Sequence, residues 1–345
     1  MFYIHHTSCV SPQQTFGDID FHTLREPVDS KLLALEPTLA DIPAGLLRRM
    51  GKAIRLGVGA GLALLKVQKV DGIIIGTSNG GLEDCVKFLA QIIEYEEGRL
   101  TPTNFVQSTP NAIAAQLGLM SENKGYNITH THRGLAFENA LLDASMMLHE
   151  HPDNTYLLGG IDEISSYNYA IEKLGNWYKE QPISNTKLYE DKSPGTLAGE
   201  GAAMFLIDKK PAGSMGKMRD MLLLHSNKQG EITQKLKQFL FINLKEEETI
   251  DLLISGENGD CRHLPYYQAV ENELPQQTSI VRYKHLCGEY PTSSAFALWL
   301  ATHMFQEKSI PTHLYKQKGS RQNKLTLIYT HYKGEQHSFI LLSNN

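Results

Sequence analysis

The chain has 345 residues, of which 41% are hydrophobic, so it can bury a large core; this excludes a disordered chain and a small disulfide-stapled fold. Lys and Arg number 33 against 38 Asp and Glu, a net charge of −5, which disfavours a protein that binds nucleic acid through a basic stripe. The four cysteines show no C-x-x-C spacing, and neither a signal peptide nor a membrane span is evident, so we expect a cytoplasmic protein with reduced thiols.

Short apolar runs alternate with helical patterns along the first half of the chain. V-D-G-I-I-I-G-T (70–77) is typical of a buried strand, and the apolar spacing after it predicts a helix over 82–95. The other predicted elements of this half are helices at 111–120 and 135–148 and strands at 126–129, 155–158, 202–207 and 221–225. The strand at 155–158 is expected to end in the Gly159-Gly160 pair.

The same alternation continues in the second half. We predict helices at 232–243, 264–273 and 295–305 and strands at 250–254, 280–283, 325–330 and 338–342. Alternating β and α elements indicate an α/β fold whose sheets carry helices on both faces, and the repetition suggests two duplicated halves. The polar stretch K-K-P-A-G-S-M-G-K (209–217) favours a boundary there, giving an N-terminal half, 1–210, and a C-terminal half, 211–345.

Two pairs of histidines have the spacing i, i+2 that could seat a metal ion. They lie in T-H-T-H-R-G (129–134) and H-E-H (149–151). No third ligand at a definite spacing accompanies them, so polar histidines near helix ends are the favoured interpretation, and no metal site is expected. His130 and His132 lie where a strand turns into a helix, whose first N–H groups could meet an anion.

Glycine clusters follow several predicted strands, in G-T-S-N-G-G (76–81), G-T-L-A-G-E-G (195–201) and G-E-N-G (256–259). Such loops often line a site at the ends of parallel strands. None fits the dinucleotide or P-loop motif, so no nucleotide cofactor is indicated.

In their order along the chain, these motifs resemble the β-ketoacyl-ACP synthases, a family with the thiolase fold. The resemblance covers nearly the whole chain, including stretches at 1–12, 46–56, 70–83, 100–114, 157–165 and 195–203. The supporting positions that it identifies are Asn111, the acidic position at Asp162 or Glu163, and Glu200. It implies a thiolase-like α/β fold in which two duplicated β/α halves form an α-β-α-β-α layered architecture.

The family's chemistry uses a Cys that accepts the acyl chain and two His that assist decarboxylation and stabilise the enolate. Aligned on Gly134, the Cys position falls on Thr131. The first His position falls on Ser255 in L-L-I-S-G-E-N-G-D (252–260). Lys284 and Gly288 of the second His motif are retained, but Glu289 stands at the His position. Thr131 is expected at the turn into the next helix, with its side chain facing the interface between the two halves.

Three missing groups predict that the decarboxylative condensation is absent, because a Thr hydroxyl needs an adjacent base and a carboxylate opposes enolate formation. The resemblance then implies a non-condensing subunit, like a chain length factor, with the acyl carrier protein as a partner. It also implies a homodimer, or a heterodimer with an active ketosynthase, formed through strand 126–129. No cofactor is expected.

Two alternatives remain open at this point. The first is an active 3-oxoacyl synthase, acyltransferase or hydrolase that uses Thr131 or Cys287 with His130, His132 or His285. The second, weaker alternative is a metal-binding protein built around the His-x-His pairs.

Overall fold

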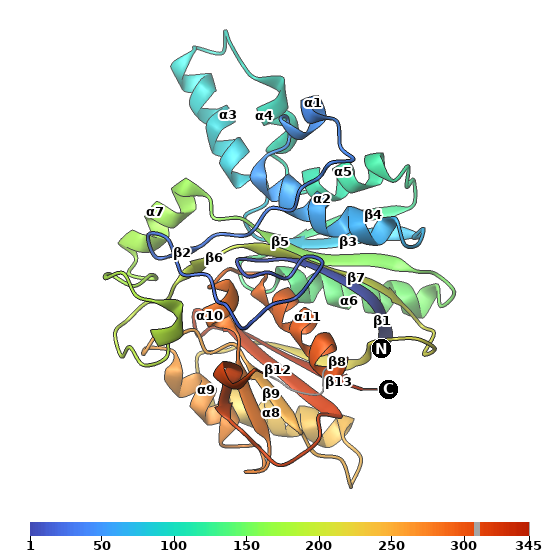
Figure 1. Ribbon diagram of the computed structural model, residues 1–345, viewed down its shortest axis with the longest axis vertical. Coiled ribbons are helices and arrows are strands. Elements are labelled where there is room, and N and C mark those ends of the chain that lie inside the picture. Colours follow the sequence, from blue (N-terminus) through green and yellow to red (C-terminus); the bar gives the residue numbers. More distant parts are fainter. Residues whose placement is uncertain (307–310, 345) are drawn as a thin grey trace.

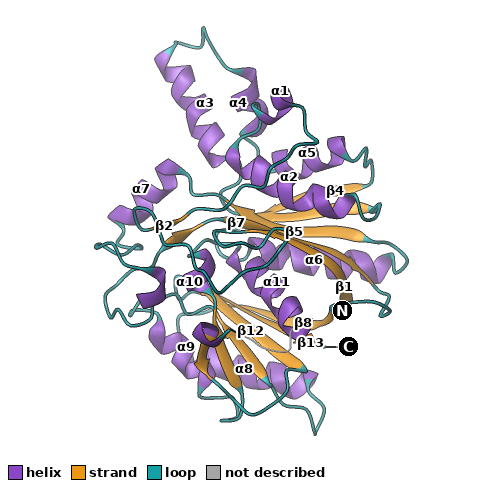
Figure 2. Cartoon of the chain, in the orientation of Figure 1, coloured by secondary structure: helices purple, strands orange, loops and turns teal. Residues whose placement is uncertain are grey.

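The computed structural model describes residues 1–306 and 311–344. Its helices and strands form five layers (Figure 1). Two parts of one sheet enclose a central layer of helices, and a further layer of helices covers the outer face of each part. Figure 2 shows the strands as two bands separated by helices. The thiolase-like, layered α/β architecture expected from the sequence is therefore confirmed.

The large sheet has 11 strands in the order β11-β10-β9-β12-β13-β8-β1-β7-β5-β3-β4. Its first part contains β1 (Phe2–Val10), β3 (Gly72–Thr77), β4 (Tyr126–Thr131), β5 (Tyr156–Asp162) and β7 (Gly201–Asp208). Its second part contains β8 (Gly216–His225), β9 (Leu252–Ser255), β10 (Ser279–Arg282), β11 (Tyr315–Gln317), β12 (Leu325–Tyr332) and β13 (Gln336–Ser343). A small second sheet pairs β2 (Lys31–Leu32) with β6 (Ala198–Gly199).

Helices cover the sheet in three layers (Figure 1). α2 (Lys52–Leu65) and α5 (Ala112–Met120) form one outer layer, α6 (Ala136–Glu150) and α11 (Ser293–Gln306) the central layer, and α8 (Gln229–Asn243) and α9 (Leu264–Glu271) the other outer layer. The remaining helices are α1 (Ala44–Leu47), α3 (Leu82–Glu94), α4 (Pro102–Gln107), α7 (Ser166–Leu174) and α10 (Lys284–Cys287), with 3-10 turns at Asn185–Lys187 and Thr312–Leu314.

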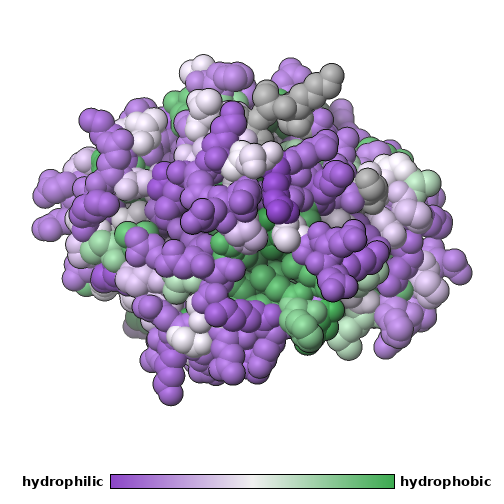
Figure 3. All heavy atoms as spheres, turned by 90° about the horizontal axis from the view of Figure 1, so that it is seen from below, coloured by the Kyte–Doolittle hydropathy of each residue, from purple (hydrophilic) through white to green (hydrophobic). Residues whose placement is uncertain are grey.

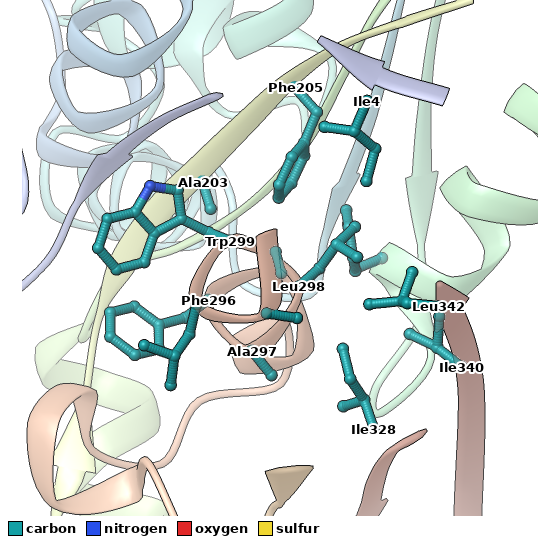
Figure 4. Packing of buried hydrophobic residues seen from close by; sticks show 14 of the residues in the cluster. Ile4, Ala203, Phe205, Phe296, Ala297, Leu298, Trp299, Ile328, Ile340 and Leu342 are labelled. Carbon is teal, nitrogen blue, oxygen red and sulfur yellow. The ribbon is translucent and has the colours of Figure 1, made fainter. Parts of the chain in front are cut away.

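A separate apolar core fills each space between layers. The largest lies around α11, whose side chains are buried on nearly every side. Phe296 and Trp299 lie on one side of this helix, and Leu298 points to the other side, toward Ile340 and Leu342 of β13 (Figure 4). This burial explains why the helix lacks a polar face, because a helix between two sheets has no side left for water.

The predicted elements are confirmed, with differences at their ends. The main difference is that β5 does not stop before the Gly159-Gly160 pair but continues to Asp162. A Cβ atom at Gly159 would lie 2.1 Å from the Met204 sulfur, and one at Gly160 would lie 2.7 Å from the Ala295 Cβ. These glycines therefore allow close packing between layers and do not mark a turn.

The predicted boundary stretch contributes a short connection between β7 and β8. These strands pair with β1 from opposite sides, so one continuous sheet joins both parts of the chain. Gly216 and Lys217 already belong to β8. The division into halves at residues 210 and 211 stays a prediction.

Candidate functional site

Loops that follow strands of both sheet parts enclose a narrow pocket of about 60 Å³. Glu163 comes after β5, Asn258 after β9, Glu289 after α10, and Tyr332 from the β12–β13 hairpin. Carboxyl ends of parallel strands commonly form binding sites because their loops converge there. The pocket is thus the meeting point of the two sheet parts.

Glu289 lines this pocket, and both oxygens of its carboxylate have partners. Oε1 accepts a hydrogen bond from Lys284 Nζ at 2.6 Å, and Oε2 accepts one from Asn258 Nδ2 at 2.8 Å. Lys284 is almost fully buried and also donates to Ser293 Oγ. The Lys284 ammonium group therefore neutralises the Glu289 carboxylate, and Glu289 acts as an acceptor and not as a donor toward the pocket.

Ser255 is the last residue of β9 and is fully buried. Its Oγ accepts a hydrogen bond from the N–H of Glu257 at 3.3 Å, so the hydroxyl supports the turn that follows. The same turn carries Asn258 to the carboxylate of Glu289. The structure thus brings the loop after Ser255 next to Glu289, but the Ser255 side chain itself is enclosed.

Thr131 ends β4, the edge strand of the large sheet, and its side chain is exposed. The expected orientation toward the space between the halves is not observed, because the residue lies at the end of an uncovered edge strand. Thr131 is not among the described residues that line the pocket. Three residues later, a Cβ atom at Gly134 would lie 2.2 Å from the Tyr332 Cβ, so this turn packs directly on the β12–β13 hairpin.

The two histidines beside Thr131 have other partners. His130 Nε2 lies 2.9 Å from Asp143 Oδ2 on α6. His132 Nδ1 accepts from the backbone N–H of Leu135 at 3.2 Å, which caps the start of α6. Among the residues that the structure describes, neither ring forms a hydrogen bond with Thr131.

Cys287 and His285 do not form a nucleophile pair either. Cys287 is fully buried; burial raises the pKa of its thiol, and its Sγ faces the carbonyl oxygen of Gly288 at 3.3 Å. The His285 ring contacts the Tyr189 hydroxyl and His313 Nδ1, both at 3.1 Å. Burial lowers the pKa of His285 to about 3, so its ring is neutral at pH 7.

The supporting polar residues hold loops in place. Asp162 is buried and accepts hydrogen bonds from the N–H groups of Ser78 and Asn79 and from Thr292. Burial raises its pKa from the usual value. These bonds fix the glycine turn after β3 against the start of α11.

Glu200 and Asn111 have comparable roles. The Glu200 carboxylate accepts the N–H groups of Ala34 and Ile164 and pairs with Lys52 at 2.5 Å. Asn111 Oδ1 accepts from Thr129 Oγ1 of β4 at 2.9 Å. Both residues therefore connect segments that are distant in the sequence.

His263 and His331 line the pocket, although no motif in the sequence points to them. Their rings meet edge to face with centroids 5.0 Å apart, and His263 stacks on Trp177. Burial lowers the pKa of both rings, so they are neutral. Within the described part of the chain, His263 Nδ1 and His331 Nε2 have no hydrogen-bond partner. These nitrogens can bind a polar group that enters the pocket.

In the sequence these two histidines are 68 positions apart in separate elements, as their numbers show. No spacing rule connects them. The two rings stand out as buried nitrogens without a hydrogen-bond partner only after the fold has placed them at the pocket.

The weaker alternative is a metal site built around the His-x-His pairs, and it would need a third ligand. In residues 1–306 and 311–344, no three His, Cys, Asp or Glu side chains gather in a way that could hold a metal ion. The same part of the chain has no helix that is both long and apolar enough to span a bilayer.

Comparison with known proteins finds a family model that matches part of the chain. Residues 26–194 match the family model described as the β-ketoacyl synthase N-terminal domain. No curated protein sequence matches the chain significantly.

Solved structures match over the whole chain. A β-ketoacyl synthase from Burkholderia phymatum STM815 is 14% identical, with a TM-score of 0.77 and full coverage of both chains. The ishigamide ketosynthase/chain length factor is 14% identical, with a TM-score of 0.75 and 99% coverage of each chain. The ketosynthase ApeO in complex with its chain length factor ApeC, from Xenorhabdus doucetiae, is 14% identical, with a TM-score of 0.75 and coverage of 100% of this chain and 98% of that one. At this identity the likeness concerns the fold.

Proposed function

We propose that this chain, whose residues 26–194 match the β-ketoacyl synthase N-terminal domain, is a non-condensing subunit that acts like a chain length factor. It pairs with an active ketosynthase and meets the acyl carrier protein in that complex. The observation that carries the proposal is the state of the three positions that resemble the catalytic Cys and the two His. They are an exposed Thr131, an enclosed Ser255 and a Glu289 neutralised by Lys284.

The chemistry of these groups argues against condensation. Acyl transfer needs a nucleophile with an adjacent base, whereas the rings of His130 and His132 are engaged with Asp143 and the α6 backbone. Enolate stabilisation needs hydrogen-bond donors where negative charge develops. Glu289 presents a carboxylate that accepts hydrogen bonds, and Ser255 Oγ faces its own turn.

The edge of the large sheet at β4 supports the pairing part of the proposal. The side chains of β4 are partly or fully exposed. This strand pairs with β3 on one side, and no described strand pairs with its other side. Elsewhere on the N-terminal part of the chain, α3 and α4 project from the body of the molecule (Figure 1) and expose Leu89, Ile93, Phe105 and Val106. An uncovered strand edge and exposed apolar side chains are each typical of a protein interface.

Proteins of similar fold have been solved as complexes of this kind. ApeO is described in complex with its chain length factor, and the AntDE:AntF structure as a ketosynthase with its acyl carrier protein. These names give the partner classes that we propose here, a ketosynthase and an acyl carrier protein.

Intact-protein mass spectrometry after incubation with acyl carrier thioesters tests the proposal. The purified chain and the ketosynthase encoded nearest to its gene are incubated separately and together. We expect an acyl adduct on the ketosynthase and none on this chain. An adduct that maps to Thr131 or Cys287 would favour the acyltransferase alternative in its place.

A further inference from the structure

The strand β8 has an uncovered edge over most of its length. On one side, β13 pairs with β8 from Lys217 to His225. On the other side, β1 pairs only with the stretch from Gly216 to Met218. Among the described strands, none pairs with residues 219–225 on that side. The edge carries M-L-L-L at 221–224, and all four side chains are partly exposed.

Apolar side chains extend from this edge onto the two neighbouring helix layers. Leu142 of α6 forms a groove of about 280 Å³ with Met221 and Leu223 of β8. On the other face of the strand, the C-terminal end of α8 exposes 87% of Phe241 and 77% of Ile242. Arg219 of β8 donates to the carbonyl oxygen of Asn243 at 2.8 Å, which keeps this end of α8 beside the strand.

Figure 3 shows apolar side chains gathered in a hollow on the face seen from below, where α8 lies. Polar residues border it on most sides, and toward the lower right the apolar region reaches the outline of the molecule. We call the apolar surface formed by α6, β8 and α8 the β8 surface. It spans three layers of the fold and is therefore broader than one added strand could cover. Long exposed apolar edges are rare in monomers, because they template pairing with another chain.

One charged residue of each sign flanks the apolar run: Asp220 in β8, and Lys228 three residues beyond the strand, at the N-cap of α8. Both are exposed. Neither forms an ion pair with any other described residue. The Asp220 carboxylate accepts the N–H of Met221 and so stays at the strand.

We propose that the β8 surface binds a second copy of this chain, with the two β8 strands antiparallel about a two-fold axis near Leu223. With the axis perpendicular to the sheet, the same face of β8 lies on the same side of the joined sheet in both copies. Leu222 of one copy then meets Leu224 of the other. In that register Asp220 lies diagonally across from Lys228 of the second copy, within reach of a long side chain. Self-complementary charge and apolar layering both favour a second copy as the occupant. The proposal does not depend on the function proposed above.

The first test compares two equally exposed apolar helix surfaces. Phe241→Asp with Ile242→Asp alters the β8 surface, whereas Ile171→Asp with Leu174→Asp alters α7, where both side chains are also exposed. Analytical ultracentrifugation of the wild-type chain and both variants measures the mass. We expect the α8 variant to have half the wild-type mass, through a weakening of at least about tenfold in self-association. The α7 variant should keep the wild-type mass, and circular dichroism checks that all three are folded.

A charge exchange tests the antiparallel arrangement. Asp220→Lys and Lys228→Asp each bring like charges together at both ends and should weaken self-association about tenfold. An equimolar mixture of the two variants restores an opposite pair at both ends. We therefore expect the mixture to associate as the wild type does.

Three results would overturn the proposal. The first is a wild-type mass that the α8 substitutions leave unchanged. The second is a mixture of charge variants that fails to associate. The third is an α8 variant that keeps its self-association but loses a bound ketosynthase, which would make the ketosynthase the occupant of the β8 surface.

Discussion

Glu163 is a pocket residue whose titration has a consequence for stability. Its Oε2 accepts the N–H of Ala53, and burial together with the nearby Asp84 carboxylate raises its pKa from 4.5 to about 7. The folded state therefore holds the proton more tightly than the unfolded state. The stability that this proton contributes is full below about pH 4.5 and is lost as the pH rises toward 7.

Glu163→Gln removes this loss while it keeps an oxygen that can accept the Ala53 N–H. We expect the free energy of unfolding at pH 8 to rise by about 1–3 kcal/mol relative to the wild type, and to change little at pH 4. Urea unfolding at both pH values measures the difference. Glu180→Gln, at an exposed position, is the control and should have no pH-dependent effect. Equal effects of Glu163→Gln at pH 4 and pH 8 would contradict the assignment.

Thr131 offers a second test, because a thiol there would be accessible whereas two native thiols are not. Burial raises the pKa of Cys287, and of Cys9 to about 12. Thr131→Cys should therefore be alkylated by iodoacetamide at least about tenfold faster than Cys9 or Cys287, as peptide mass spectrometry can measure. The variant should still form no β-ketoacyl product from malonyl carrier protein, because single repairs of a group that acts as a unit recover little. Slow labelling at position 131 would contradict the exposed placement.

Gly134 determines how the turn after β4 meets the β12–β13 hairpin. A Cβ atom at this position would overlap Tyr332 at 2.2 Å. Gly134→Ala should therefore lower the free energy of unfolding by about 1–3 kcal/mol. Gly230→Ala is the matched control, because nothing lies within 4 Å of a Cβ there and the residue lies in the first turn of α8. It should leave stability unchanged or raise it by up to about 1 kcal/mol. Thermal unfolding that ranks the two variants in the opposite order would contradict this packing.

Element positions could be predicted from the sequence, but the burial of their faces could not. The spacing of Leu82, Val86, Leu89 and Ile93 correctly predicts a helix, yet α3 has no buried residue. The periodicity shows that one face is apolar and says nothing of what covers it. Likewise the Gly159-Gly160 pair looks like a strand end but serves packing between layers.

The exposed face of α3 leads to a prediction about the ketosynthase partner. Ile93 is 82% exposed, so Ile93→Asp should change the free energy of unfolding by less than about 0.5 kcal/mol. If α3 and β4 form the interface with the ketosynthase, the same variant should weaken that complex at least about tenfold. Phe241→Asp on α8 is the matched control and should leave the complex intact. Unchanged binding by Ile93→Asp in a pull-down titration would exclude α3 from this interface.

The layered architecture was predictable in outline because β and α elements alternate and the family motifs keep their order. Details of the candidate site were less accessible. The sequence indicates that Lys284 is retained and that Glu289 replaces a His, but not that the ammonium group of one neutralises the carboxylate of the other. The contact between His263 and His331 depends on how two loops meet, and no local pattern encodes it.

The most direct test of the non-condensing role measures carbon dioxide released from malonyl carrier protein labelled at its free carboxyl. The chain is assayed alone, the ketosynthase partner alone, and the two together, with an acyl carrier thioester present. We predict no release above background from the chain alone, and release from the complex that depends on the partner's catalytic Cys. Release by the chain alone, accompanied by a β-ketoacyl product and abolished by Thr131→Ala, would contradict the proposal and establish Thr131 as a nucleophile.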